Sequence, residues 1–155
     1  MKQPAEMRGG YPVAAFDSLP GGERLVVKAL RHWSEGPDGV ARIAEMLGER
    51  MAPDAAAVCH RALGDMLRVV AGHGRRKLVR HGAGCACVGA DEAVLAHFVM
   101  LAATGDREDA MLVGSLMVEG PLLPRFTEAA RQAGLLLYRA DLAGAGPGPV
   151  APTVH

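Results

Sequence analysis

The stretch that decides the fold is Pro53–Ala71, PDAAAVCHRALGDMLRVVA. Apolar residues recur in it at intervals of three and four, the spacing that places side chains on one face of an α-helix. The members of this stripe are Ala55, Val58, Cys59, Ala62, Leu63, Met66, Leu67 and Val70. The pattern predicts a long amphipathic helix with one buried face.

Five further segments favour helices on the same grounds, separated by glycine and proline. These predicted helices begin near Ser18, Asp38, Asp91, Asp106 and Leu123. Ser18, Asp38 and Asp106 are of the residue types that cap helix N-termini. Hydrophobic residues make up 50% of the chain but aromatic residues only 4%, a mixture that favours helices over sheets. We therefore expect an all-α fold, a single compact bundle of about six helices.

Both ends of the chain lack helical periodicity. Residues 1–17 contain scattered proline and glycine, and the last residues, from Gly144 onwards, are dominated by them. We expect a flexible N-terminal arm over residues 1–17, a helical domain over 18–142 and a disordered tail over 143–155.

Charge and hydropathy exclude several classes of protein. The 17 basic and 17 acidic residues balance, which gives no general attraction to nucleic acid or to an acidic membrane surface. No apolar run approaches the roughly 18–20 residues of a membrane span, and the N-terminus lacks the apolar segment of a secretory signal. The sequence predicts a cytoplasmic protein without a membrane partner.

The residues with the most chemistry lie together in residues 81–87, HGAGCAC. Thiolates and a neutral imidazole are the ligands that zinc prefers, and glycines let a loop curl around an ion. We predict a zinc ion held by His81, Cys85 and Cys87, with His97 on the following helix as the fourth ligand. Further candidate ligands are Cys59, His60, His73 and Asp91.

In this interpretation the metal fixes the loop, and the protein has a regulatory role through a protein partner or a second copy of itself. The chain is short, its polar residues lie mostly at helix ends, and no acid–base pair converges in the sequence, so the pattern disfavours an enzyme. The residues Met111, Leu112, Leu116 and Met117 could supply a self-association surface.

Two other functions stay open. Cys85 and Cys87 precede a predicted helix and follow several arginines, and both features lower a thiol pKa, so the pair could perform thiol redox chemistry. The helices over 38–51 and 54–71 faintly resemble a helix-turn-helix, which would make the protein a DNA-binding regulator. The turn lacks the usual glycine, and the basic cluster around Arg75 has no interleaved aromatic residues, so binding to nucleic acid is disfavoured.

A purely structural interpretation needs no ligand. Cys85 and Cys87 would pack as small apolar residues, and His81 would hydrogen-bond to a backbone carbonyl. For Cys59, which lies within the apolar stripe of the longest helix, we expect this structural role.

Overall fold

The computed structural model describes residues 8–145. Residues 1–7 and 146–155, which include most of the predicted tail, lie outside the described range. Within it, six α-helices form the bundle. They are α2 (Gly21–Trp33), α3 (Pro37–Gly48), α4 (Pro53–His73), α5 (Ala90–Thr104), α6 (Arg107–Gly114) and α7 (Leu123–Ala145). The predicted all-α bundle of about six helices is confirmed.

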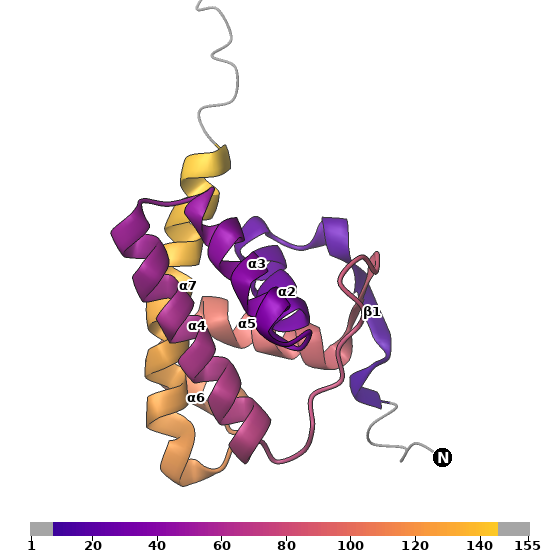
Figure 1. Cartoon of the computed structure of the whole chain (residues 1–155). Helices are drawn as coiled ribbons and strands as arrows, with labels where there is room; N and C mark the ends of the chain where they lie inside the picture. The colour runs from indigo at the N-terminus through magenta and orange to yellow at the C-terminus, as the bar shows by residue number, and fades with distance from the viewer. Residues whose placement is uncertain (1–7, 146–155) are drawn as a thin grey trace, which may run out of the picture.

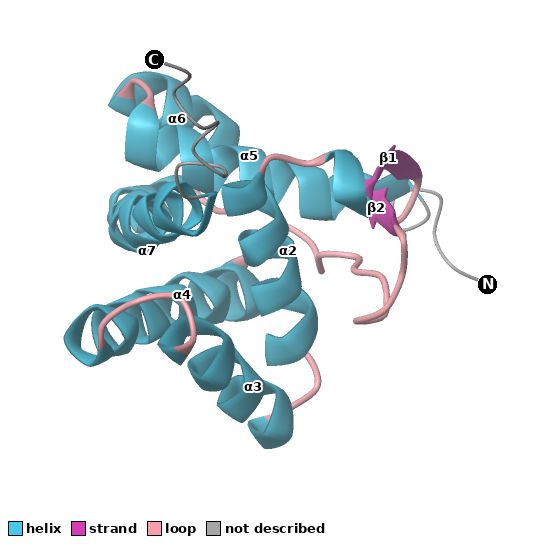
Figure 2. Ribbon diagram, turned by 90° about the horizontal axis from the view of Figure 1, so that it is seen from above, coloured by secondary structure: helices cyan, strands magenta, loops and turns pink. Residues whose placement is uncertain are grey.

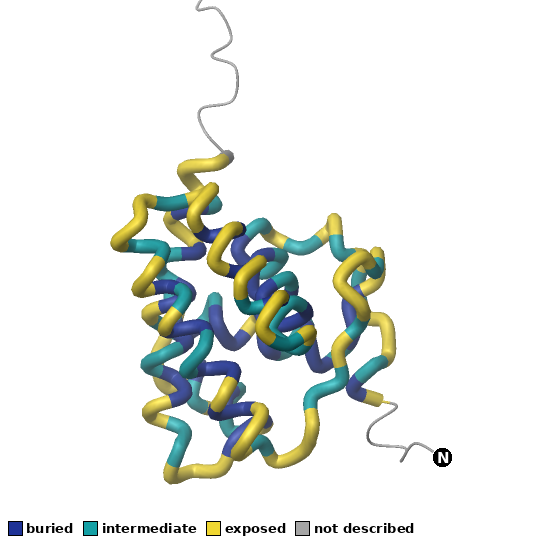
Figure 3. The backbone as a smooth tube through the Cα atoms, in the orientation of Figure 1, coloured by how far each residue is buried: buried dark blue, intermediate teal, exposed yellow. Residues whose placement is uncertain are grey.

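The centre of the bundle lies where α7 packs against both α4 and α5, while α2 packs on α5 and α3 joins α2 to α4. Figures 1 and 2 show α4 and α7 running side by side, with α5 crossing beside them. The rings of Phe98 and Phe126 stack between α5 and α7 with their centroids 4.6 Å apart. Buried residues line the inner faces of the helices, and exposed residues follow the outer faces (Figure 3).

The apolar stripe of the longest helix is buried almost as predicted. Cys59, Leu63 and Met66 are fully buried in α4. Val58 departs from the prediction, because its side chain is 44% exposed. It lies one residue before Cys59, at the edge of the stripe, where a helix of 3.6 residues per turn carries the side chain away from the core.

Two short strands are the main departure from the expected elements. Strand β1 (Pro12–Ala15) pairs antiparallel with β2 (Cys87–Gly89), so that Ala15 faces Cys87. The amide of Phe16 donates to the carbonyl of Ala86 at 2.7 Å and extends this pairing. Part of the segment expected to be a free arm therefore lies against the cysteine-containing loop, near the start of α5 (Figure 2).

Of the three predicted helix caps, one is confirmed. The carboxylate of Asp106 accepts the backbone N–H groups of Glu108 and Asp109, at 2.8 and 3.2 Å, and caps α6. The prediction for Asp38 is wrong, because α3 begins at Pro37 with Gly36 as its N-cap and Asp38 lies within its first turn. The prediction for Ser18 is also wrong. Residues 16–18 form the 3₁₀ turn η1 directly after β1, and Ser18 donates its hydroxyl back to Ala15.

The last connection before α7 is a second 3₁₀ turn, η2 (Gly120–Leu122). From there α7 continues unbroken to Ala145. None of the helices within residues 8–145 is long and apolar enough to cross a membrane.

Candidate functional site

The segment from Gly74 to Ala86 leaves the end of α4 and returns as β2 without regular structure of its own (Figure 1). We call residues 81–87 the Cys loop. A loop of this length needs side chains to fix its backbone, because it has no hydrogen-bond ladder to do so. Two arginine–carboxylate pairs supply these contacts.

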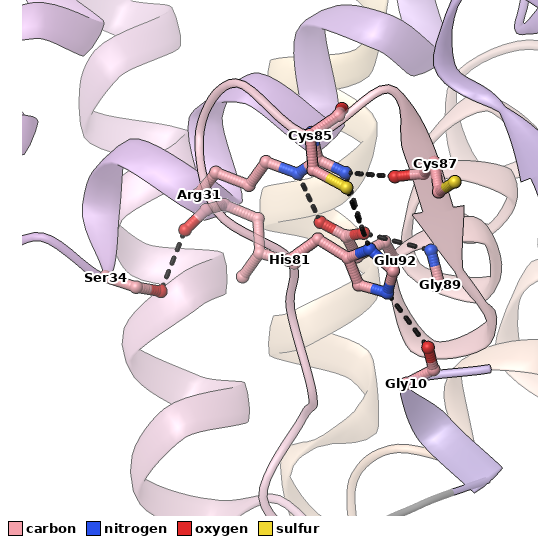
Figure 4. Close-up of polar contacts among 9 residues, drawn as sticks. Gly10, Arg31, Ser34, His81, Cys85, Cys87, Gly89 and Glu92 are labelled. Carbon is pink, nitrogen blue, oxygen red and sulfur yellow. Dashed lines mark hydrogen bonds and ion pairs between the residues drawn. The ribbon is translucent and has the colours of Figure 1, made fainter. Parts of the chain in front are cut away.

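The first pair is Arg31 of α2 with Glu92 of α5, drawn in Figure 4. The Arg31 side chain is almost fully buried and donates to both carboxylate oxygens of Glu92, at 2.6 and 3.0 Å. Two further N–H groups reach the carbonyls of Cys85, at 2.9 Å, and Cys87, at 2.7 Å. One guanidinium group therefore fixes the main chain on both sides of Ala86.

Glu92 completes this arrangement from the other side. It is fully buried, and its Oε1 also accepts the backbone N–H of Gly89 at 3.0 Å, at the start of α5. A buried charge is tolerated only when it is paired and hydrogen-bonded, and here both members are. The hydrogen bond to Glu92 is the main cause that raises the pKa of Arg31, which favours the charged guanidinium group.

Sequence reasoning missed both residues. Arg31 was hidden inside an amphipathic helix, where an arginine normally reaches solvent. The one available signal was Glu92, which lies in the first turn of α5, where a glutamate often bonds back to the backbone amide before the helix.

The second pair joins Asp91 of α5 to Arg76 of the preceding segment. Both terminal guanidinium nitrogens of Arg76 donate to the Asp91 carboxylate, which also accepts the backbone N–H of Val79 at 2.7 Å. Asp91, a predicted candidate metal ligand, is 5% exposed and serves this structural contact.

His81 and Cys85 form the chemically distinctive part of the loop (Figure 4). The Nδ1 atom of His81 lies 3.3 Å from Sγ of Cys85, and Nε2 lies 2.9 Å from the carbonyl oxygen of Gly10. A carbonyl oxygen only accepts, so Nε2 carries a proton. In the neutral ring, Nδ1 therefore presents a lone pair to the thiol of Cys85, and in the charged ring it donates to the thiolate.

The pKa values of both groups are shifted in the direction of the charged pair. The hydrogen bond with His81 is the main cause that lowers the pKa of Cys85, followed by a hydrogen bond with the Cys87 backbone. The same contact with Cys85, and then the Gly10 carbonyl, raise the pKa of His81. The positive charge of Arg31 also lowers the pKa of the Cys85 thiol.

The remaining predicted residues do not join this pair. Cys87 is exposed, and its sulfur points away from Cys85 and His81 (Figure 4). His97 is exposed on α5, so the expectation that it faces the loop is wrong. Cys59 is fully buried, which raises its pKa to about 12, and its thiol lies 3.8 Å from the Ala133 carbonyl, in agreement with the structural role expected for it.

The predicted function as a zinc-binding protein is wrong. Residues 8–145 contain no group of three or more histidine, cysteine, aspartate or glutamate side chains that could hold a metal ion. The reason lies in the surroundings of each candidate. His81 uses its second nitrogen on Gly10, Asp91 is engaged by Arg76, and His97 and Cys87 face solvent.

The structure also corrects the idea of Cys85 and Cys87 as a redox pair. All three cysteines are free, and Arg31 holds the backbone carbonyls of both loop cysteines while their sulfurs point in different directions. A disulfide needs both sulfurs turned toward each other at a defined angle. Cys85 has a histidine as its neighbour in place of a second thiol.

Comparison with known proteins adds no further information about this site: no protein-family model, curated protein or solved structure matches the chain.

Proposed function

We propose that Cys85 is a single nucleophilic thiol with His81 as its general base, and that its covalent modification by an electrophilic small molecule is the regulatory event of this protein. The observation that carries the proposal is the placement of the His81 ring between the Cys85 sulfur and the Gly10 carbonyl. A base held by a third group beside a nucleophile is the arrangement that activates thiols.

The proposed step is an addition to an α,β-unsaturated carbonyl compound. His81 Nδ1 holds the thiol proton, and the Cys85 thiolate forms a carbon–sulfur bond at the β-carbon. The π electrons of the double bond move toward the carbonyl group, and the α-carbon then takes the proton from His81. Atoms and electrons balance without an oxidant or a metal.

A modified Cys85 would act on the fold through the same contacts that now hold the loop. The adduct would separate Cys85 from His81, which also contacts Gly10 next to β1. The pairing of β1 with β2 would therefore weaken while the helical core stays intact. Strand β1 in the N-terminal segment is therefore the element that we expect to loosen when Cys85 is modified.

The test is the rate of modification by N-ethylmaleimide, an unsaturated carbonyl compound, followed by intact-mass spectrometry. The variant Cys87→Ala leaves Cys85 as the accessible thiol, and Cys85→Ala leaves Cys87. We expect Cys85 to react several times faster than Cys87 at neutral pH and to keep its rate to lower pH, because its thiolate persists there.

Two histidine variants distinguish activation of the Cys85 thiol by His81 from mere exposure of that thiol to solvent. His81→Gln should slow Cys85 to the rate of Cys87, while the matched change His97→Gln on the exposed face of α5 should leave the rate unchanged. Equal rates for the two cysteines, or a Cys85 rate that His81→Gln does not alter, would overturn the proposal. Circular dichroism of each variant confirms that the fold is retained.

A second proposal concerns self-association. Leu112 of α6 and Leu116 in the turn after it are 69% and 68% exposed and lie four positions apart in the chain, whereas Met117 is buried. Part of the surface suggested by the sequence is therefore available for a second copy of the chain. Light scattering would show a dimer that Leu112→Ser with Leu116→Ser converts to a monomer, while Leu142→Ser on α7 has no effect; a monomer at all concentrations would contradict this proposal.

A further inference from the structure

A cavity of about 450 Å³ lies between the segment Gly74–Arg80 and helices α2 and α4. This volume falls in the range of small-molecule sites. Its lining differs from the Cys loop, because neither His81 nor Cys85 contributes to it.

The helical side of this cavity is apolar. Leu30 of α2 and Leu67 and Val70 of α4 are buried core residues whose side chains reach its wall. Trp33, at the end of α2, and Leu78, from the opposite segment, are partly exposed there. A ligand that enters would remove apolar surface from water on both sides.

The segment side of the cavity is cationic. Its charged lining residues are Arg76, Lys77 and Arg80, and no acidic side chain lines the cavity. Arg76 is neutralised by Asp91, but Lys77 and Arg80 have no ion pair within residues 8–145. The uncompensated charge at the cavity therefore comes from two cations beside an apolar wall.

We propose that this cavity binds a small amphipathic anion, an apolar chain or ring that carries one carboxylate. The apolar body lies against Trp33, Leu67 and Val70, and the carboxylate faces Lys77 and Arg80. An uncharged apolar compound would leave the cations unused, and a small hydrophilic anion would leave the apolar wall exposed. Both halves of the ligand are therefore needed for affinity.

Trp33 provides the measurement, because it is the single tryptophan of the chain. Decanoate is the probe, decanol is the uncharged match and acetate is the headgroup alone. We expect decanoate to shift the fluorescence of Trp33 with saturation, decanol to bind about ten-fold more weakly, and acetate to have no effect below about 1 mM. The double variant Lys77→Gln, Arg80→Gln should bring decanoate to the affinity of decanol.

A matched pair of variants on α4 shows which of two cavities beside Trp33 binds decanoate. Trp33 also lines a second cavity of about 500 Å³, between α3 and α4. Ala71 is exposed and lines the first cavity, and Ala57 is exposed and lines the second, so each accepts a larger side chain at the surface. Ala71→Phe should abolish the decanoate signal, and Ala57→Phe should leave it intact.

Three results would overturn this inference. They are the absence of a saturable response to decanoate, equal binding of decanoate and decanol, and loss of the signal in Ala57→Phe with retention in Ala71→Phe. None of them bears on the reactivity of Cys85, which is measured separately.

Discussion

At the scale of single residues, the position of the Cys loop depends on the guanidinium group of Arg31. Its three nitrogens make four hydrogen bonds, to both carboxylate oxygens of Glu92 and to the carbonyls of Cys85 and Cys87. Removing one member of a buried ion pair leaves the other uncompensated, and this costs far more than the pair contributes. Arg31 and Glu92 should therefore behave as one unit.

The first prediction is that Arg31→Met lowers the free energy of unfolding by about 3–5 kcal/mol, because Glu92 remains buried without its partner. The double variant Arg31→Met, Glu92→Leu should lose less than the sum of the two single changes, since no buried charge is left. Urea denaturation followed by circular dichroism measures all three variants.

The control is Arg42→Met, which removes an ion pair with Glu35 at the surface, where the Arg42 side chain is 56% exposed. This change should cost less than about 1 kcal/mol. Additive losses in the Arg31 and Glu92 variants would contradict the coupling of these two residues.

The sequence alone identifies the chemical groups of the candidate site but not the distant residues that contact them. The sequence singled out His81 and Cys85 because imidazole and thiolate groups are zinc ligands; the structure places the two side chains in contact, without a zinc site. The partners of His81 could not be predicted, since Gly10 is 71 positions away and approaches only through the pairing of β1 with β2. Arg31 was missed for the same reason, as its acceptors lie 54–61 positions away.

At the scale of elements, α7 and α5 approach closely where α7 has a glycine. A Cβ atom at Gly134 would lie 2.7 Å from the carbonyl oxygen of Val99 and 2.8 Å from the Cβ atom of Ala103. Neither atom can move without shifting the α5 backbone. Gly134 therefore sets the distance between the two helices.

The second prediction compares two glycines of α7. Gly134→Ala should lower the free energy of unfolding by about 1–3 kcal/mol, because the overlap outweighs the better helix propensity of alanine. Gly144→Ala meets no atom within 4 Å and should change stability by less than about 0.5 kcal/mol. Thermal denaturation of both variants measures the difference, and equal effects would show that α5 and α7 have room to separate.

The third prediction concerns the ion pair between Glu128 and Arg131 in α7. Arg131 is the main cause that lowers the pKa of Glu128 to about 2, and Arg107 of α6 adds to it. A carboxylate with a lowered pKa stabilises the fold above its unfolded pKa of about 4.3, and this contribution is lost as the pH falls toward 2. Both side chains are 41% exposed, so solvent screening limits the contribution to less than about 1 kcal/mol.

The wild-type protein should therefore be more stable than Glu128→Gln at pH 6, and the difference should vanish near pH 2. Urea denaturation across this range measures it. Glu119→Gln is the control, because Glu119 is exposed and forms no ion pair within the described residues. A difference that grows as the pH falls would contradict the assigned direction of the pKa shift.

The elements themselves were largely predictable, because helical periodicity depends on near neighbours in the chain. The stripe of α4 and the cap at Asp106 follow from residues three and four positions apart. Strand β1 could not be predicted, since its four residues show no alternation and pair with residues more than 70 positions away. The start of α2 was misplaced because β1 and η1 fix the chain up to Ser18.

At the scale of the whole molecule, the structure has a helical core and a smaller unit attached to it. The core is the bundle of six helices, α2 to α7, and the attached unit comprises β1, the Cys loop and β2 at the start of α5 (Figures 1 and 2). Within this unit β1 has no buried residue and β2 buries Val88 in the apolar core, and Arg31 and His81 add polar contacts. The helices, by contrast, pack through many buried apolar side chains. Regions with few buried apolar contacts open at lower free energy than the core.

The fourth prediction follows from this division. Reaction of Cys85 with N-ethylmaleimide should speed amide hydrogen exchange in β1 and β2, because the adduct displaces His81 from its contacts with Cys85 and Gly10. Exchange in α4 and α7 should stay unchanged, since their hydrogen bonds lie within packed helices. The same reagent applied to Cys85→Ala, where Cys87 is still exposed, is the control; faster exchange in both proteins would assign the change to Cys87, and faster exchange throughout the helices would show that the strands and the core unfold as one unit.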